Sequence, residues 1–381
     1  MTLLNFQPLK DYLNKICNVD GLPVCECRVI YKGDVVFDHQ AGKYDKDRNM
    51  YFMYSMTKPT TSALIMILVE KGILSLEDTV DKYLPEYAEM TYKKDGKILP
   101  CKNKMTLYNL ITMQGGYGYD FDSDAFKKMY AEKPNATNRD VAFALSEDPL
   151  EYEPGEGFQY SLCYDVFPAI VEVATGRAYE DVIREYIFEP LGMTRSTFKY
   201  TPELAKKIAD FYSYNGEKQC LESLESNLKY RFNSDKTTSG GAGMMSCMDD
   251  YAKFAFMLAN KGVSFEGKRI LSEDSINLMR RNHMKDITKY PRASQGYAYG
   301  FGFRVLMNNS ACESNVPVGE FEVTGAAGSL GLFNTMDNIA IVFIEHVLGF
   351  PGAYGEHHFK VRDLAYQGLG FGTKESVLIE Y

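Results

Sequence analysis

The 381-residue sequence lacks several features that mark large classes of protein. No apolar run reaches the roughly 20 residues needed to cross a bilayer. Residues 1–10 show no basic segment leading into an apolar stretch, so we expect no signal peptide and a cytoplasmic location. There is no internal repeat and no low-complexity linker. The net charge of −9 argues against nucleic acid or an anionic membrane as the main partner.

The motifs of several common enzyme classes are also missing. No Gly-x-Ser-x-Gly elbow occurs, which argues against an α/β-hydrolase. The five histidines include no His-Glu-x-x-His, and we expect the His357-His358 pair to be solvated rather than to bind a metal. Gly300-Phe-Gly302 lacks the rest of a dinucleotide fingerprint. The eight cysteines are scattered except for Cys25-Glu-Cys27, and we expect them to be reduced core residues.

The most informative stretch contains Ser55 and Lys58. Residues 63–69 are continuously apolar, which in a soluble chain predicts a helix buried on all sides. Pro59 suits the first turn of that helix, and Gly72 suits its end. The pattern therefore places Ser55 at the N-terminal end of a buried helix, with Lys58 one turn along on the same face.

This geometry suits nucleophilic catalysis by Ser55. A serine hydroxyl is a weak nucleophile and needs an adjacent base. Lys58 can accept its proton only if the amine is neutral, and we expect burial to lower the pKa of Lys58 enough for that. The four residues 55–58 would look the same in an ordinary helix start with a capping serine and a solvated lysine. Other segments of the chain are therefore needed to distinguish a catalytic pair from a structural one.

The remaining periodicities predict a sheet built from both ends of the chain, with a helical region between. The strands are expected at residues 24–31, 35–39, 299–307, 320–324, 330–334 and 339–345. A helix carrying Leu9, Tyr12, Leu13 and Ile16 opens the chain, and a helix at 356–367 should pack beside it. Residues 76–229 are mainly helical, with a loop at 92–103. We expect an α+β fold: a sheet domain (1–80 and 235–381), a helical domain (81–234) and an active site at their junction.

Two further segments carry candidate site residues. Tyr160 lies in the segment Gly157–Asp165, and a phenol beside a lysine can be partly ionised and pass a proton. The segment Phe321–Ser329 carries Val323, Gly325 and Ala326. Taken alone, this second segment would be an edge strand marked by glycines, with no chemistry.

Ser55-Met-Thr-Lys58, its apolar helix and the block Gly72–Pro85 resemble the serine β-lactamase/penicillin-binding protein superfamily, whose motifs include Ser-x-x-Lys. The likeness is to the class C-like branch, with its carboxylesterases and D-aminopeptidases, and it extends with gaps over residues 24–369. It implies the β-lactamase/transpeptidase-like fold and an acyl-enzyme mechanism without metal or organic cofactor. Ser55 would attack, Lys58 would accept the proton and Tyr160 would relay it. Gly325 would belong to the substrate strand, and the Ser55 and Ala326 amides would form the oxyanion hole.

The sequence departs from that family at three expected substrate contacts. Leu162 replaces an asparagine of the lactamases, Val323 replaces a lysine or histidine, and Gln114 lies where His-Thr-Ser-Gly is usual. We therefore expect small neutral carboxylic esters as substrates, unless an arginine such as Arg292 or Arg304 supplies the missing charge. An amide-cleaving relative (a β-lactamase, D-aminopeptidase or DD-peptidase) and a non-catalytic binding protein with this fold remain open alternatives.

Overall fold

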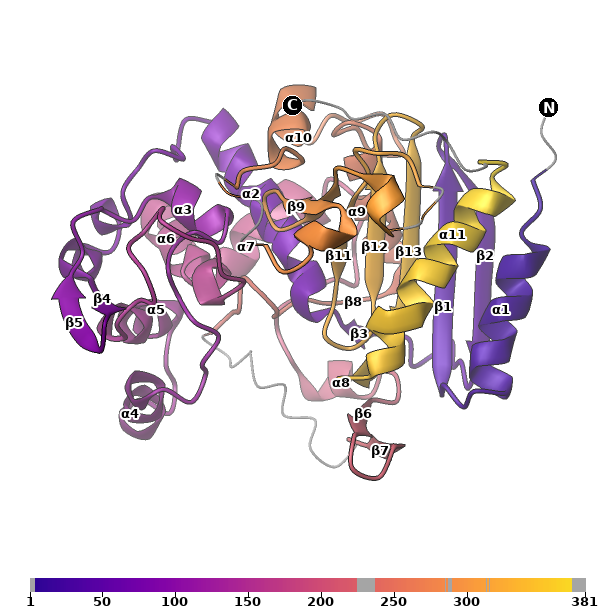
Figure 1. Cartoon of the computed structure of the whole chain (residues 1–381), viewed down its shortest axis with the longest axis horizontal. Coiled ribbons are helices and arrows are strands. Elements are labelled where there is room, and N and C mark those ends of the chain that lie inside the picture. Colours follow the sequence, from indigo (N-terminus) through magenta and orange to yellow (C-terminus); the bar gives the residue numbers. More distant parts are fainter. Residues whose placement is uncertain are drawn as a thin grey trace.

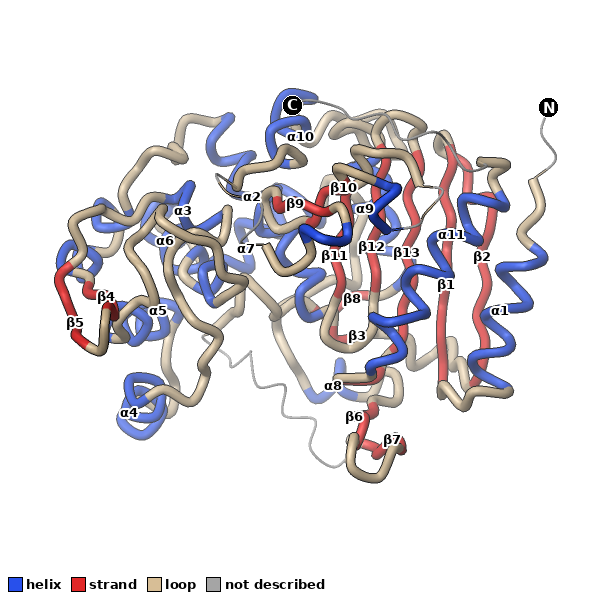
Figure 2. The backbone as a smooth tube through the Cα atoms, in the orientation of Figure 1, coloured by secondary structure: helices blue, strands red, loops and turns tan. Residues whose placement is uncertain are grey.

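The computed structural model describes residues 4–224, 237–284, 286, 290–312, 314 and 316–371. Its central feature is a seven-stranded antiparallel sheet in the order β2-β1-β13-β12-β11-β10-β9 (Figures 1 and 2). The strands of this sheet are β1 (Val24–Tyr31), β2 (Asp34–Gly42), β9 (Tyr297–Tyr299), β10 (Arg304–Leu306), β11 (Phe321–Thr324), β12 (Leu330–Asn334) and β13 (Ile339–Glu345). Both ends of the chain thus contribute strands, as predicted.

Helices cover both faces of the sheet. Helices α1 (Gln7–Asn18) and α11 (His358–Gly368) lie side by side on one face, and α9 (Met248–Ala259) lies on the other (Figure 1). The alternation of side chains along β1 fixes this arrangement. The Cys25 thiol meets α1, whereas the Arg28 guanidinium, on the opposite face, bonds to Asp249 of α9 at 2.8 Å. This double cover explains why β12 and β13 are buried along their whole length.

The segment between the two halves of the sheet is mainly helical. Its helices are α2 (Thr57–Glu70), α3 (Leu107–Ile111), α4 (Asp124–Glu132), α5 (Asn138–Glu147), α6 (Phe167–Thr175), α7 (Tyr179–Ile183) and α8 (Pro202–Ala205), and α10 (Glu273–Met279) follows α9. Figure 1 shows most of them gathered to the left of the sheet. The division into domains stays a prediction, and its boundary near residue 234 lies outside the described residues.

Two short hairpins interrupt the region that was expected to be helices and loops. β4 (Thr91–Lys94) pairs with β5 (Lys97–Pro100) where a loop was predicted, so that prediction is wrong. The pattern of long, half-exposed side chains in this hairpin gives no clean apolar alternation. β6 (Tyr212–Asn215) pairs with β7 (Cys220–Ser223) and with β14 (Val347–Leu348). A fourth pair, β3 (Tyr51–Phe52) with β8 (Met245–Ser246), holds the chain just before Ser55.

The strand predicted at 299–307 is also wrong, because this stretch reverses direction. It contributes the end of β9 and the whole of β10, joined by a turn in which the Gly300 N–H bonds to the Phe303 carbonyl at 2.9 Å. Gly302 in that turn has φ = +79°, a conformation that favours glycine. Apolar side chains continue through the turn because it is buried, so the hydrophobic pattern hides the reversal.

Several other elements agree with the prediction. All four apolar positions of the first helix are buried, and β12 and β13 have the predicted bounds. The histidine pair is a correction: His357 and His358 are 5% and 6% exposed rather than solvated. His357 pairs with the buried Glu345 carboxylate, and His358 bonds to the Gly328 carbonyl at 3.0 Å. The cysteines are free, but Cys220 is exposed and so is not a core residue.

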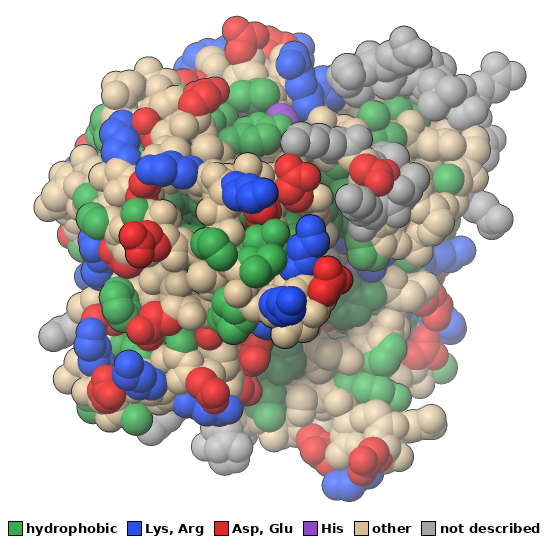
Figure 3. Space-filling model, turned by 60° about the vertical axis from the view of Figure 1, so that its left-hand side comes forward, with side chains coloured by type: hydrophobic (Ala, Val, Ile, Leu, Met, Phe, Trp, Pro, Cys, Tyr) green, Lys and Arg blue, Asp and Glu red, His purple; other side chains and the backbone are tan. Residues whose placement is uncertain are grey.

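One face of the molecule is turned forward in Figure 3. Basic and acidic side chains are intermixed there, and no broad patch of one sign dominates that view. Across the described ranges, none of the helices has the length and apolar character needed to cross a bilayer. The cytoplasmic location stays a prediction.

Candidate active site

Ser55 lies in a tight turn that leads straight into α2. A 3₁₀ turn, Tyr54–Met56, joins β3 to the helix, and Ser55 is 8% exposed. Tyr54 has φ = +47°, which is an unfavourable conformation for a bulky residue and one often found at functional sites. The Met53 N–H bonds to the Met244 carbonyl at 3.0 Å, and this bond anchors the turn. The backbone therefore fixes where the Ser55 hydroxyl lies.

Lys58 lies one helical turn further along, as predicted, and is 1% exposed. Its Nζ is 3.1 Å from Ser55 Oγ and 2.9 Å from the Gly241 carbonyl oxygen. Two glycines leave room for it. A Cβ on Gly241 would lie 2.9 Å from Asp165 Oδ2, and one on Gly302 would lie 3.2 Å from the Lys58 Cβ. The slot around Lys58 thus depends on two residues that carry no side chain.

The charge state of Lys58 differs from the prediction. Burial lowers its pKa, but the phenol oxygens of Tyr160 and Tyr119 and the carboxylate of Asp165 raise it by more, so the pKa of Lys58 is above its usual value. The prediction of a neutral amine considered the apolar helix alone and is wrong. The raised pKa favours the ammonium form of Lys58, which donates a hydrogen bond to Ser55 Oγ.

Two tyrosines complete the cluster around Ser55. The Tyr160 ring centroid lies 4.6 Å from Lys58 Nζ, so the structure brings the three predicted residues together. Tyr119 stacks on Tyr160 with ring centroids 5.9 Å apart. The Tyr119 side chain is 45% exposed, yet its hydroxyl end lies inside the site, where it hydrogen-bonds to Ser55. Burial raises the pKa of Tyr119 to about 12, although the Lys58 charge acts in the opposite direction.

Asp165 ties the glycine-rich loop, residues 238–243, to this cluster. Its carboxylate accepts a hydrogen bond from the Ser239 hydroxyl, and it lies close enough to Lys58 for their charges to interact. Burial raises the pKa of Asp165, while the Ser239 bond and the Lys58 charge lower it. The loop then presents the Gly241 carbonyl to Lys58. Neither Tyr119 nor Asp165 was singled out from the sequence, because neither belongs to a spaced motif.

The end of β11 lies directly against the Ser55 turn. A Cβ on Gly325 would come within 2.5 Å of the Met53 carbonyl oxygen, so only glycine permits this approach. The Gly325 carbonyl accepts a bond from the Tyr354 hydroxyl at 2.8 Å, and the Ala326 carbonyl accepts one from the Gly349 N–H at 3.2 Å. These bonds fix the turn that carries the predicted oxyanion donor, the Ala326 N–H. Its role stays a prediction.

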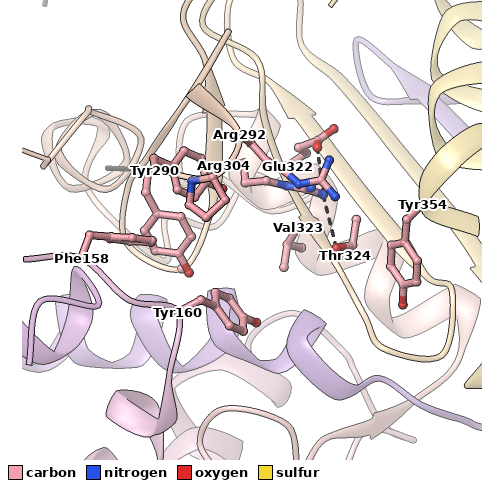
Figure 4. A pocket seen from close by; sticks show the side chains of 12 residues that line it. Phe158, Tyr160, Tyr290, Arg292, Arg304, Glu322, Val323, Thr324 and Tyr354 are labelled. Carbon is pink, nitrogen blue, oxygen red and sulfur yellow. Dashed lines mark hydrogen bonds and ion pairs between the residues drawn. The ribbon is translucent and has the colours of Figure 1, made fainter. Parts of the chain in front are cut away.

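A cavity of about 290 Å³ opens beside this cluster (Figure 4). Its lining residues are Phe158, Tyr160, Tyr290, Pro291, Arg292, Tyr299, Gly302, Arg304, Glu322, Val323, Thr324 and Tyr354. Val323 lines it as expected, but not as part of an apolar wall. Figure 4 shows the Arg292 and Arg304 side chains close together above Val323, next to Glu322.

Two predicted substrate contacts lie elsewhere. Leu162 is 2% exposed and packs in the hydrophobic core. Gln114 lines a separate, smaller cavity that shares Phe158 with the first, and its Nε2 bonds to Thr112 Oγ1 at 2.9 Å and to the His283 carbonyl at 3.1 Å. The structure therefore does not bring Gln114 or Leu162 into the Ser55 pocket. Within the part of the chain that the structure describes, no three His, Cys, Asp or Glu side chains gather as a metal site would require.

The sheet flanked by helices, with a Ser-x-x-Lys pair at the start of a buried helix, defines the fold class of the serine β-lactamases. The family model described as Beta-lactamase matches residues 22–365, so the chain belongs to the β-lactamase family, whose members with this fold include serine hydrolases. Protein Rv1367c of Mycobacterium tuberculosis is 26% identical over 328 residues, which cover 84% of this chain and 76% of that protein.

Two solved structures are similar in fold. EstCE1, a hydrolase with promiscuous acyltransferase activity, has a TM-score of 0.77 at 21% identity, covering 95% of this chain and 99% of EstCE1. Simvastatin synthase (LovD) from Aspergillus terreus has a TM-score of 0.76 at 18% identity, covering 95% and 97%. At these identities the likeness shows the fold alone.

Proposed function

We propose that the chain is a serine hydrolase that cleaves small carboxylic esters through an acyl-enzyme on Ser55. One observation carries this proposal: the buried Lys58 Nζ lies 3.1 Å from Ser55 Oγ, beside a cavity large enough for a small acyl group. Burying an ammonium group lowers the stability of the folded state, so a buried Lys58 that took part in no reaction would be unfavourable. The non-catalytic alternative leaves both the ammonium and the strained turn at Tyr54 without a purpose.

The raised pKa of Lys58 changes the proton path that was expected. An ammonium cannot accept the Ser55 proton, so that proton has to be relayed by another hydroxyl group near Ser55. We assign that role to Tyr160, whose ring contacts Lys58. Tyr119 orients the Ser55 hydroxyl. Ser55 Oγ attacks the carbonyl carbon, its proton passes to Tyr160, and Tyr160 returns that proton to the leaving alkoxide.

The second half of the reaction uses the same groups. The Ser55 and Ala326 amides hold the negative oxygen of the tetrahedral intermediate. Water then replaces the alcohol and attacks the acyl carbon, Tyr160 accepts one proton from the water, and Ser55 leaves protonated. No step requires a metal or organic cofactor.

We favour esters over lactams and peptides because two positions expected to contact an amide side chain do not face the Ser55 pocket. Leu162 lies in the core, and Gln114 faces a different cavity, so neither presents an amide group to the Ser55 pocket. An amide-cleaving activity, as a β-lactamase, D-aminopeptidase or DD-peptidase, is the second candidate, because Arg292 in the pocket wall supplies a positive charge that Val323 does not.

The test is to incubate the protein with a fluorophosphonate probe, and separately with a penicillin, and to weigh each product. We expect a single fluorophosphonate adduct that peptide mapping places on Ser55, and none on Ser55→Ala. Hydrolysis of a short 4-nitrophenyl ester should disappear in the same variant. An adduct on Ser239 or Ser329 would refute the assignment, and efficient penicillin turnover with poor ester cleavage would favour the amide-cleaving candidate.

A further inference from the structure

Two arginines line the pocket beside Ser55, and their environments differ. Arg304 of β10 is almost fully paired. Its Nη2 lies 2.9 Å from a Glu322 carboxylate oxygen and 3.3 Å from the Thr324 hydroxyl, and both members of the ion pair have little exposed side-chain surface. Figure 4 shows both interactions. The Glu322 charge is thus used within the protein and balances Arg304.

Arg292 has no such partner. Its Nη1 bonds to the neutral side-chain oxygen of Gln295 at 3.0 Å, and no carboxylate of the described residues lies within ion-pair distance of it. Partial burial, together with the Arg304 charge, lowers the pKa of Arg292. Among the described residues, two guanidinium groups face a single carboxylate, and this leaves one positive charge in the pocket wall unbalanced. A positive charge in a pocket wall that no carboxylate balances attracts an anion into the pocket.

A buried hydroxyl in the same pocket also lacks a partner. Tyr299 is 2% exposed, and its hydroxyl oxygen finds no hydrogen-bonding group in the portion of the chain that the structure describes. Its ring lies among those of Phe158, Tyr290 and Tyr160, with centroids 5.0, 5.9 and 6.4 Å away. Buried hydroxyl groups are rarely left without a hydrogen bond. The hydroxyl oxygen itself is closed off from solvent, so Tyr299 contributes an aromatic wall to the cavity.

We infer that the pocket binds the carboxylate of an acyl chain, with Arg292 as its main partner. Resting on the proposed function, this inference makes the substrate a half-ester of a short dicarboxylic acid. Its ester carbonyl would lie at Ser55 and its free carboxylate at Arg292. A carboxylate carries one negative charge, which matches the one unbalanced positive charge better than a phosphate dianion does. The earlier expectation of neutral esters held only if neither Arg292 nor Arg304 supplied the charge that Val323 lacks.

The reaction stays a simple acyl transfer. The bond from the acyl carbon to Ser55 Oγ forms while the bond to the alcohol oxygen breaks, and the alcohol leaves with the serine proton. Water then releases the dicarboxylic acid and restores Ser55. The remote carboxylate keeps its charge throughout, and no oxidant or reductant is involved.

The test compares two fluorogenic esters of equal chain length, 4-methylumbelliferyl hexanoate and the 4-methylumbelliferyl half-ester of adipic acid. The wild-type protein should cleave the anionic ester with at least about tenfold higher kcat/KM. Arg292→Gln should lower that value about 10- to 100-fold, the range of a charge-assisted hydrogen bond, and leave the hexanoate within about threefold. Arg177→Gln is the matched control, because Arg177 pairs with Glu185 at the surface, away from the pocket.

Two results with the esters would overturn the inference. One is a wild-type preference for the hexanoate, and the other is an equal loss on both esters in Arg292→Gln, which would give Arg292 a structural role only. Calorimetry with free adipate separates this inference from the proposed function. If Ser55 takes up no fluorophosphonate, the hydrolase proposal fails, whereas adipate binding by the wild type and not by Arg292→Gln would still establish the carboxylate site. Equal or undetectable binding by the two proteins would refute it.

Discussion

Three glycine-to-alanine variants separate the two reasons why the Lys58 slot requires glycine. Gly302 combines a left-handed backbone (φ = +79°) with close contacts: its Cβ would lie 2.9 Å from the Tyr164 hydroxyl and 3.2 Å from Ser62 Oγ. Gly72, at the end of α2, has φ = +68° but nothing within 4 Å of the added Cβ. Gly241 has the reverse combination, with a Cβ 2.9 Å from an Asp165 oxygen and no left-handed backbone.

The magnitudes follow from these geometries. A left-handed conformation costs an alanine about 1–2 kcal/mol, and an added methyl group in a packed interior costs about 1–3 kcal/mol. Gly72→Ala should therefore lower the free energy of unfolding by about 1–2 kcal/mol, Gly241→Ala by about 1–3 and Gly302→Ala by about 2–5. Only the last two should also slow ester cleavage, because both displace atoms around Lys58.

Urea unfolding followed by circular dichroism gives the three stabilities, and turnover of a short 4-nitrophenyl ester gives the activities. Gly72→Ala controls for the backbone cost, since it changes no contact near the site. The reasoning fails if Gly302→Ala is as stable and as active as Gly72→Ala, because the space around Lys58 would then not depend on the missing side chain.

Three further predictions concern protons. Tyr160→Phe should slow ester turnover about a hundredfold or more and leave the fold unchanged. Tyr119→Phe should slow it only about tenfold, the scale of one neutral hydrogen bond. Equal rates in both variants and the wild type would show that the two side chains only pack and take no part in catalysis. Lys58→Arg should be about as inactive as Lys58→Ala, because the larger guanidinium does not fit the slot; a near-wild-type rate would contradict this. Burial raises the pKa of Glu26, which bonds to the Tyr51 hydroxyl, to about 7, so the folded state holds this proton more tightly than the unfolded state does. The contribution of Glu26 is then fully present below pH about 4.5 and is lost as the pH rises through about 7, a change of about 3 kcal/mol. Glu26→Gln should remove this dependence in urea unfolding between pH 5 and 8, and an unchanged slope would refute the assignment.

The parts of the site that could be predicted are those whose residues lie close together in the sequence or belong to a recognisable family segment. Ser55 and Lys58 belong to one helix start, so their spacing alone sets their proximity. The Tyr160 segment was found through its resemblance to a family block. Tyr119 has no such signal, because its hydroxyl reaches Ser55 only through the folding of an irregular segment.

The charge of Lys58 could not be predicted for a related reason. The apolar residues that follow it in the sequence lower its pKa, but the groups that raise it come from positions 119, 160 and 165. In the same way, Val323 alone suggested an apolar wall, while Arg292 and Arg304 reach that wall from a different segment and a neighbouring strand. Secondary structure was predicted well where burial matched a simple period, as in β12 and β13. It was predicted poorly where an apolar run turned back on itself, as between β9 and β10.

The pairing of β1 with β13 has a consequence for synthesis on the ribosome. Cys25 lies opposite Glu345, so about 300 residues must be translated after β1 before its partner strand exists. At roughly 5–20 residues per second, the β1–β2 hairpin waits about 15–60 s with one edge unpaired. The side chains of β1 are almost all buried in the finished protein, and an apolar edge of this kind readily joins the wrong strand. The nascent chain is therefore a natural client for a chaperone that shields exposed strands during this interval.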